Sequence, residues 1–206
     1  MHNGRLRESI REKISKGNEL EMNKLLIATN NQGKVKELQE LLADTDIQLV
    51  TPAAIQLELD VHEDGSTYAE NAAKKAFTFA QASGLISLAD DSGLEVDILD
   101  GAPGLYSARY GSSNGEKLSD AGRRQFLLQN LKDKPRPWTA RFHATIAIAI
   151  PEPLWSQAAN RLRNQEPAPG LHMFEGYCPG EIIPEERSSA RLASSNSANL
   201  ASSKCA

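Results

Sequence analysis

The stretch LLIATNNQGKVKELQELLA, residues 25–43, decides the fold class. Its first four residues are a short continuous apolar run, which is typical of a buried β-strand. A polar turn follows over residues 29–33, and residues 34–43 then place Val35, Leu38, Leu41 and Leu42 at helical spacing. The stretch therefore predicts a strand, a tight polar loop and a helix, which is the repeating unit of an α/β protein.

The rest of the chain continues this alternation. We expect strands at 47–50, 85–89 and 139–150, and helices at 67–83 and 116–131. Residues 90–93 are interpreted as a turn that ends the 85–89 strand, and a last strand at 174–183 is expected to be interrupted at Pro179-Gly180. These alternating elements predict one α/β domain.

Length and composition fit this prediction. The 206 residues, 40% of them hydrophobic, suffice for one domain with a core, and no apolar run is long enough to cross a membrane. A net charge of −4 argues against a broad nucleic-acid surface. Only two cysteines are present, without metal-ligand spacing or a disulfide framework, which fits a reducing cytoplasm.

The two ends of the chain differ from its middle. Residues 1–21 are rich in charge and precede a second methionine, Met22, so we interpret them as an extension outside the fold. Residues 188–206 include twelve Ser or Ala and no aromatic, acidic or glycine residue, which predicts disorder. The expected domain therefore covers 22–187.

A first candidate site lies in the loop after the first strand. Backbone N–H groups at the start of a helix bind anions, and Gly33 allows close approach of a phosphate. Thr29 and Asn30 add hydrogen-bond donors, and Lys34 adds a positive charge. The alternative is an ordinary helix cap with a solvent-exposed lysine.

Two further groups of residues carry candidate chemistry. Asp90-Asp91-Ser92 follows a hydrophobic strand, where two carboxylates could hold Mg²⁺ and one could deprotonate a water molecule. Glu63 and a lysine of the next helix would add a further carboxylate for a metal and a cation for a phosphate. The alternatives are an acidic turn and exposed helix charges.

Together, these segments resemble the inosine/xanthosine triphosphate pyrophosphatase family. The resemblance covers roughly 22–187 and rests on ordered blocks: LIATNNQGKVKEL (26–38), EDGSTYAENA (63–72) with Lys75, ADDSGLEVD (89–97), GAPGLYSARY (101–110), Arg141-Phe142, and the Gly-Glu-Ile strand ending at Ile182.

The resemblance implies a fold and a reaction. The fold would be an elongated central mixed sheet flanked by helices, with two lobes and the active site in the cleft between them, usually in a homodimer. The reaction would be the Mg²⁺-dependent hydrolysis of ITP, dITP and XTP to the nucleoside monophosphate and pyrophosphate, which cleanses the purine nucleotide pool.

It also implies roles for individual residues. Asp91 would be the general base and a metal ligand, with Asp90 and Glu63 as further metal ligands. The substrate would be bound by residues from the three segments: Thr29, Asn30, Asn31, Gln32, Gly33, Lys34, Lys75 and Ser92. Some family members carry another glutamate where this chain has His62.

The resemblance ends near Arg187. The family continues into a Gly-Phe-Gly-Tyr-Asp-Pro segment and a later Ser-His-Arg segment that reads the base, whereas no Phe or Tyr follows Tyr177 here. The change is typical of a frameshift followed by an early stop. One alternative is an inactive truncated product or nucleotide-binding fragment; another, resting only on Asp90-Asp91, is a general phosphate-ester hydrolase.

Overall fold

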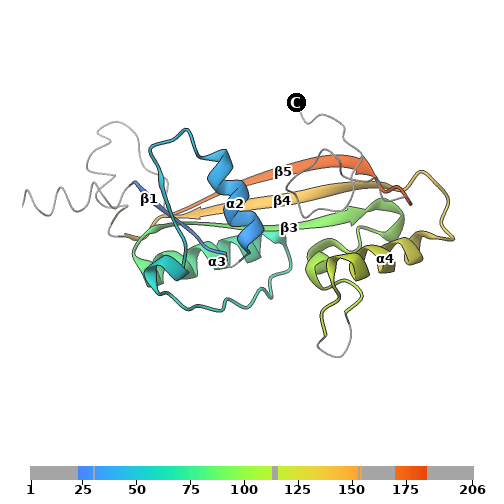
Figure 1. Ribbon diagram of the computed structural model, residues 1–206, viewed down its shortest axis with the longest axis horizontal. Helices are drawn as coiled ribbons and strands as arrows, with labels where there is room; N and C mark the ends of the chain where they lie inside the picture. Colours follow the sequence, from blue (N-terminus) through green and yellow to red (C-terminus); the bar gives the residue numbers. More distant parts are fainter. Residues whose placement is uncertain (1–22, 30, 113–115, 153, 155–169, 185–206) are drawn as a thin grey trace, which may run out of the picture. The chain divides into compact units, whose positions relative to one another are not determined.

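A computed structural model describes residues 23–29, 31–112, 116–152, 154 and 170–184. Five strands form one mixed sheet in the order β2-β1-β3-β4-β5 (Figure 1). Their bounds are β1 Lys24–Ile27, β2 Gln48–Val50, β3 Ile86–Val96, β4 Thr139–Ala149 and β5 Leu171–Glu181. The predicted extension, residues 155–169 and the Ser/Ala-rich tail lie outside the described residues.

The contacts divide the described chain into two units. Unit 1 holds the residues up to Asp90 and from Ile146 to Met173, and unit 2 holds those from Asp91 to Thr145 and from Phe174 onward. Among the described residues, no helix is both long and apolar enough to cross a bilayer.

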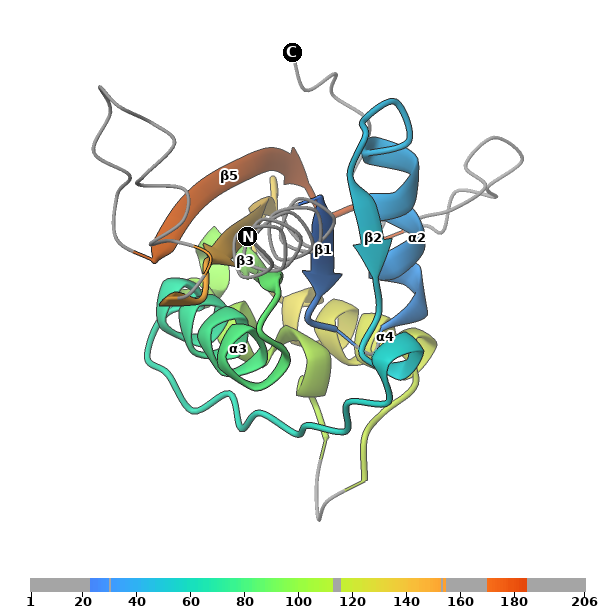
Figure 2. The same ribbon diagram turned by 90° about the vertical axis from the view of Figure 1, so that its left-hand side faces the viewer.

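In unit 1, two helices enclose the parallel strands. Helix α2 is Gln32–Leu41, α3 is Tyr68–Ser83, and a short 3-10 turn, η1 at Ala53–Ile55, lies between them. β1 pairs in parallel with both β2 and β3. The connection from β1 to β2 and the connection from β2 to β3 run in opposite directions along the sheet. Because such crossovers are right-handed, α2 and α3 lie on opposite faces of these strands (Figure 2).

Helix α3 packs closely because its inner face is small. Ala72, Ala76 and Ala80 repeat every four residues and are completely or almost completely buried, with Phe79 beside them. They contact the apolar strand residues of the unit 1 core, among them Leu26, Val50 and Ala89. The helix ends at Gly84, whose φ of 71° favours glycine.

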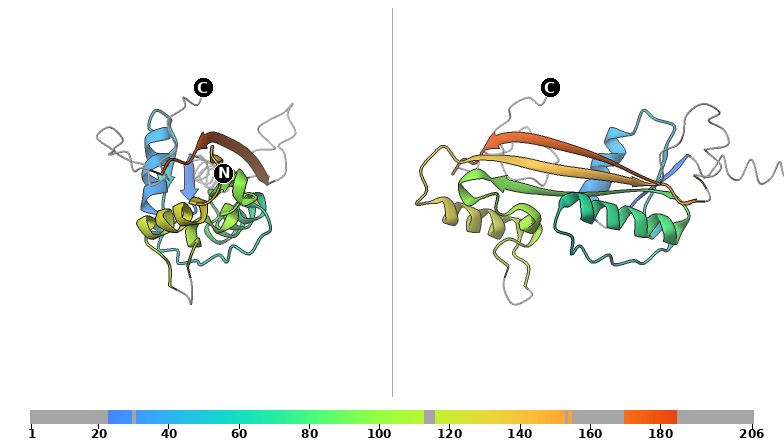
Figure 3. Two further views of the ribbon diagram at one scale, coloured as in Figure 1. Left: turned by 90° about the vertical axis from the view of Figure 1, so that its right-hand side faces the viewer. Right: turned by 180° about the vertical axis from the view of Figure 1, so that it is seen from behind.

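In unit 2, helix α4, Asp120–Leu131, covers one face of the strands (Figure 3). Its Leu127 and Leu131 pack with Leu94, Val96, Trp138, Ala140 and Ile182. Two 3-10 turns, η2 Asp97–Leu99 and η3 Gly104–Arg109, connect β3 to this helix.

Three sequence predictions about element bounds were wrong. Residues 90–93 are not a turn, because β3 lies between β1 and β4 in the sheet and remains a strand through Val96. Pro179-Gly180 does not interrupt β5, which is last in the strand order, and an edge strand tolerates proline. α4 begins at Asp120, because the side chain of Ser119 caps it by accepting a hydrogen bond from Gly122 (3.1 Å).

Candidate active site

The loop after β1 is organised around the start of α2. Asn31 is the N-cap: its side chain accepts a hydrogen bond from the Gly33 N–H at 2.9 Å, and its own N–H donates to Thr29 Oγ1 at 3.2 Å. Gln32 and Gly33 lie in the first turn of α2, where backbone N–H groups and the helix dipole favour anions. Asn30 lies outside the described residues.

Lys34 is not an isolated surface charge. Its ammonium forms an ion pair with the Asp90 carboxylate, and the two side chains are 32% and 18% exposed. The parallel register of β1 and β3 explains this meeting of residues 56 positions apart. Ile27 is opposite Leu88, so that the residues just past each of them lie at the same end of the sheet.

Lys75 of α3 joins the same group. Its ammonium contacts the Glu63 carboxylate and donates a hydrogen bond to the main-chain carbonyl of Asp90 at 2.9 Å. The Lys75 side chain is only 13% exposed. Two carboxylates and two ammonium groups, from Lys34, Glu63, Lys75 and Asp90, thus form one charge cluster within unit 1.

The segment that carries Glu63 is anchored on both sides. Before it, Leu57, Leu59 and Val61 pack on the unit 1 core at every second residue. After it, the Gly65 N–H donates to the buried Asn71 side chain at 2.8 Å. The segment therefore has little freedom to move Glu63.

The start of α3 adds to this anchoring. Thr67 caps the helix by accepting from the Glu70 N–H at 3.1 Å, and the Glu70 carboxylate accepts from the Ser66 N–H at 2.6 Å. Asn71 was missed as a site-supporting residue by the sequence analysis. The sequence feature that could have revealed it is the Thr67/Glu70 capping pattern, because this pattern predicts that the loop folds back on the start of the helix.

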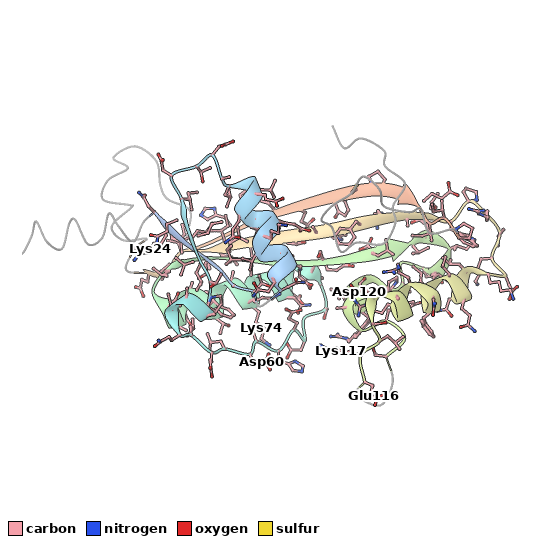
Figure 4. All side chains as sticks on the ribbon, viewed as in Figure 1. Lys24, Asp60, Lys74, Glu116, Lys117 and Asp120 are labelled. Carbon is pink, nitrogen blue, oxygen red and sulfur yellow. The ribbon has the colours of Figure 1, made fainter. Side chains whose placement is uncertain are left out.

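The exposed side of α3 carries a separate ion pair. Lys74, which Figure 4 labels together with Asp60 of the preceding loop, contacts Asp64 at 2.5 Å. The hydrogen bond and the charge of Lys74 hold the pKa of Asp64 below its usual range. Lys74 and Lys75 are thus neighbours in sequence with different carboxylate partners.

Asp91 and Ser92 follow on β3 and belong to unit 2. The Asp91 carboxylate accepts a hydrogen bond from the Ser92 N–H at 2.9 Å. A regular strand directs successive side chains to opposite faces, so β3 does not present Asp90 and Asp91 as the pair that a turn would present. Within the described parts of the chain, no three Asp, Glu, His or Cys side chains are grouped closely enough to hold a metal ion.

Two carboxylates are nevertheless suited to Mg²⁺. Mg²⁺ is usually held by one or two carboxylates, with waters and substrate phosphates completing its shell. Glu63 and Asp90 are both partly exposed and both already face a cationic group. Each of the two carboxylates is therefore suited to be a Mg²⁺ ligand, and their binding of one shared ion, like the role of Asp91 as a ligand, stays a prediction.

Unit 2 holds a second charged cluster around Glu95. The Glu95 carboxylate contacts Arg141 Nε at 2.6 Å and His143 Nδ1 at 3.1 Å. Burial raises the pKa of Glu95, but the hydrogen bonds and charges of His143 and Arg141 outweigh it, so that the pKa is lowered overall. The His143 ring also packs on Tyr177, with centroids 4.3 Å apart. The neighbouring Phe142 is partly buried and packs against the apolar cluster of unit 2 instead.

Comparisons with family models, with relatives and with solved structures all identify similarity to one protein family. Residues 25–192 match the model of the Ham1 family. The chain is 45% identical to a dITP/XTP pyrophosphatase of Desulforamulus reducens, over 79% of this chain and 72% of that protein. It is 42% identical to a dITP/XTP pyrophosphatase of Listeria monocytogenes, over 80% of each chain. Among solved structures, a HAM1 protein of Coxiella burnetii matches with a TM-score of 0.63 and 34% identity, over 80% of this chain and 75% of that one.

Proposed function

Because the chain belongs to the Ham1 family, we propose that it hydrolyses nonstandard purine nucleoside triphosphates, namely dITP, ITP and XTP, to the nucleoside monophosphate and pyrophosphate. The observation that carries the proposal is the charge cluster of Lys34, Glu63, Lys75 and Asp90 beside the N-terminus of α2. It combines groups for a polyphosphate with groups for a divalent cation.

The triphosphate would be held by the loop and the first turn of α2. Backbone N–H groups at a helix start point toward an anion, and the helix dipole favours its charge. Thr29, Asn30, Asn31, Gln32 and Gly33 form this binding segment, and Lys34 neutralises phosphate charge. Lys75 and Ser92 are proposed as further substrate contacts.

Glu63 and Asp90 would hold Mg²⁺, and Asp91, which a regular strand directs to the other face, is proposed as a further ligand on its place in the ADDSG block alone. When bound, the ion supplies charge stabilisation for the pyrophosphate leaving group. The carboxylates of Asp90 and Glu63 are held in place without the ion, because Lys34 and Lys75 form ion pairs with them.

Asp91 is proposed as the general base. It would accept a proton from a water molecule whose oxygen attacks the α-phosphorus, while the bond from that phosphorus to the bridging oxygen breaks. The electron pair of the broken bond stays on the pyrophosphate, whose charge Lys34 stabilises. The support for this role is the position of Asp91 in the ADDSG block, directly after Asp90.

We also propose that the protein acts in the cytoplasm as a homodimer, as the family resemblance implies. The support for the compartment is the cysteine usage, which fits a reducing environment. Light scattering coupled to size-exclusion chromatography measures the mass of the assembly, and a monomeric mass would contradict the dimer.

One assay tests the reaction and its alternatives. ITP, XTP, dGTP and ATP are each incubated with the protein, with and without Mg²⁺; the protein is then removed by ultrafiltration, and phosphate is measured after an inorganic pyrophosphatase, as the coupling enzyme, and Mg²⁺ are added to every sample. Mg²⁺-dependent release from ITP and XTP, absent when the coupling enzyme is omitted, supports the proposal. Release without the coupling enzyme indicates a general phosphatase, and no release from any substrate indicates an inactive nucleotide-binding fragment.

A further inference from the structure

The charge cluster of unit 1 is neutral as it stands. Asp90 and Glu63 each carry one negative charge, Lys34 and Lys75 each carry one positive charge, and each carboxylate is in contact with an ammonium group. A divalent cation and a lysine ammonium seek the same carboxylate oxygens. The resting contacts therefore compete with any metal ion that binds there.

Neither ligand suits the neutral cluster alone. A divalent cation that displaces Lys34 from Asp90 leaves that ammonium without its carboxylate and raises the net charge of the four side chains and the ion to +2. A triphosphate that arrives alone meets a lysine already neutralised by Asp90. When both arrive, the ion takes the carboxylate, and the freed ammonium and the net positive charge meet the phosphates.

We propose that Lys34 is an exchangeable internal counter-cation of Asp90: a divalent metal ion takes the Asp90 carboxylate and the triphosphate takes the freed Lys34 ammonium, so that metal and triphosphate bind with positive coupling. This inference rests on the proposed function and adds a thermodynamic linkage between the two ligands to it. Coupling between two ligands is reciprocal, and typical values change an affinity by roughly 5- to 150-fold.

Lys75 has a different role in the same cluster. Its ammonium is bonded to the Asp90 main-chain carbonyl as well as to Glu63, and its side chain is less exposed than that of Lys34. A carbonyl oxygen on a strand stays in place when a metal ion binds. Lys75 therefore holds the Glu63 segment beside β3 in addition to its proposed contact with the substrate, and Lys34 is the residue that exchanges.

The test measures metal binding without turnover. Mn²⁺ affinity is determined by electron paramagnetic resonance on the full chain, alone and with α,β-methylene inosine triphosphate, after subtraction of Mn²⁺ held by the free analogue. The variant Lys34→Met keeps the length of the side chain and removes its charge. Lys36→Met is the matched control, because Lys36 lies on the same helix in an exposed pair with Glu40.

The proposal predicts opposite effects on the two measurements. Lys34→Met should bind Mn²⁺ alone at least about 5-fold more tightly than the parent, and the gain in affinity caused by the analogue should shrink. Lys36→Met should change both quantities less than about twofold, since its charge does not contact Asp90. If Lys34→Met does not fold, as judged by circular dichroism, Lys34→Gln carries the same expectation.

Failure of the inference is distinguishable from failure of the proposed function. If the parent hydrolyses dITP but Lys34→Met binds Mn²⁺ alone no better than the parent, the counter-cation role is wrong and the reaction stands. If the parent binds no Mn²⁺ with or without the analogue and hydrolyses none of the substrates, both are overturned.

Discussion

Partial burial determines what the Lys34–Asp90 pair can do. Fully exposed ion pairs contribute about 0–1 kcal/mol, and removing one partner of a fully buried pair costs about 3–5 kcal/mol. With side chains that are 32% and 18% exposed, this pair lies between the two cases. It is held well enough to order the cluster, and a ligand of higher charge can still displace it.

Asp91 gives the sharpest test at the scale of one residue. Asp91→Asn should lower kcat for dITP by about 100-fold or more, because a nearly isosteric amide accepts no proton from water at neutral pH. Steady-state kinetics at saturating Mg²⁺, with a circular dichroism spectrum to verify folding, measures the effect.

The matched control for this substitution is Asp100→Asn. Asp100 is exposed and has a φ of 52°, a conformation that asparagine also adopts readily, so activity and stability should stay near the parent values. A kcat of Asp91→Asn within threefold of the parent would remove Asp91 from the mechanism.

The sequence predicted Lys34 and Lys75 as site residues but not which carboxylates they contact. The helix start within 29–34, which we propose as the anion-binding segment, was predictable because a helix start is a local feature of the chain. The pairing of Lys34 with Asp90 was not, since it depends on the register between β1 and β3 across 56 residues. Lys75 was predicted as a phosphate contact, and its bonds to Glu63 and the Asp90 carbonyl became visible only with the strand in place.

At the scale of elements, the segment before α3 depends on one small residue. A Cβ on Gly65 would lie 2.7 Å from Asn71 Oδ1 and 2.8 Å from Glu70 Cβ, both closer than real contacts allow. Gly65→Ala should therefore break the bond from Gly65 to Asn71 and displace Glu63. We expect a loss of about 1–3 kcal/mol in the free energy of unfolding, and a raised Mg²⁺ requirement for hydrolysis.

Urea denaturation and Mg²⁺ titrations of activity measure the two effects. Gly176→Ala in β5 is the control, because a Cβ there would meet no atom within 4 Å. It should leave both quantities nearly unchanged. Equal behaviour of the two alanine variants would mean that the segment does not rely on close packing at Gly65.

Most elements were predicted correctly by type, and the error at residues 90–93 has a clear physical cause. α3 and β4 have clear periodic patterns, with Ala72, Ala76 and Ala80 on one helix face and alternating apolar residues along 142–150. Asp90-Asp91-Ser92-Gly93 has the composition of a turn, yet it lies within β3, which has a neighbouring strand on each side. Local composition cannot report the hydrogen bonds that distant strands supply.

At the scale of the whole molecule, Glu95 makes stability depend on pH. Its pKa is lower in the folded state than in the unfolded chain, so the unfolded state binds the proton more readily. The stabilisation is present above the unfolded-state pKa and is lost as the pH falls through the lower folded-state value. Glu95→Gln should therefore flatten the acid side of the stability profile.

The measurement is a series of urea denaturations between neutral pH and the acidic range. Glu58→Gln, the same substitution at an exposed position, is the control and should keep the slope of the parent. An unchanged slope in Glu95→Gln would show that the contacts with Arg141 and His143 do not persist in solution.

Base selectivity tests whether residues 188–206 contribute to recognition of the substrate. Strong discrimination between ITP and GTP needs buried polar groups that the correct base satisfies and the wrong base leaves unpaired. The proposed phosphate and metal groups all lie within residues 29–92, whereas residues 188–206 contain no histidine or aromatic residue and only Arg191 and Lys204 as charged residues. We therefore expect residues 188–206 to add little base selectivity, so that a variant without them keeps the ITP/GTP ratio of kcat/KM within about twofold of the parent. Steady-state kinetics of the two proteins with ITP and GTP measures this ratio. A fall of roughly tenfold or more in the preference for ITP in the shortened variant would show that residues 188–206 take part in reading the base.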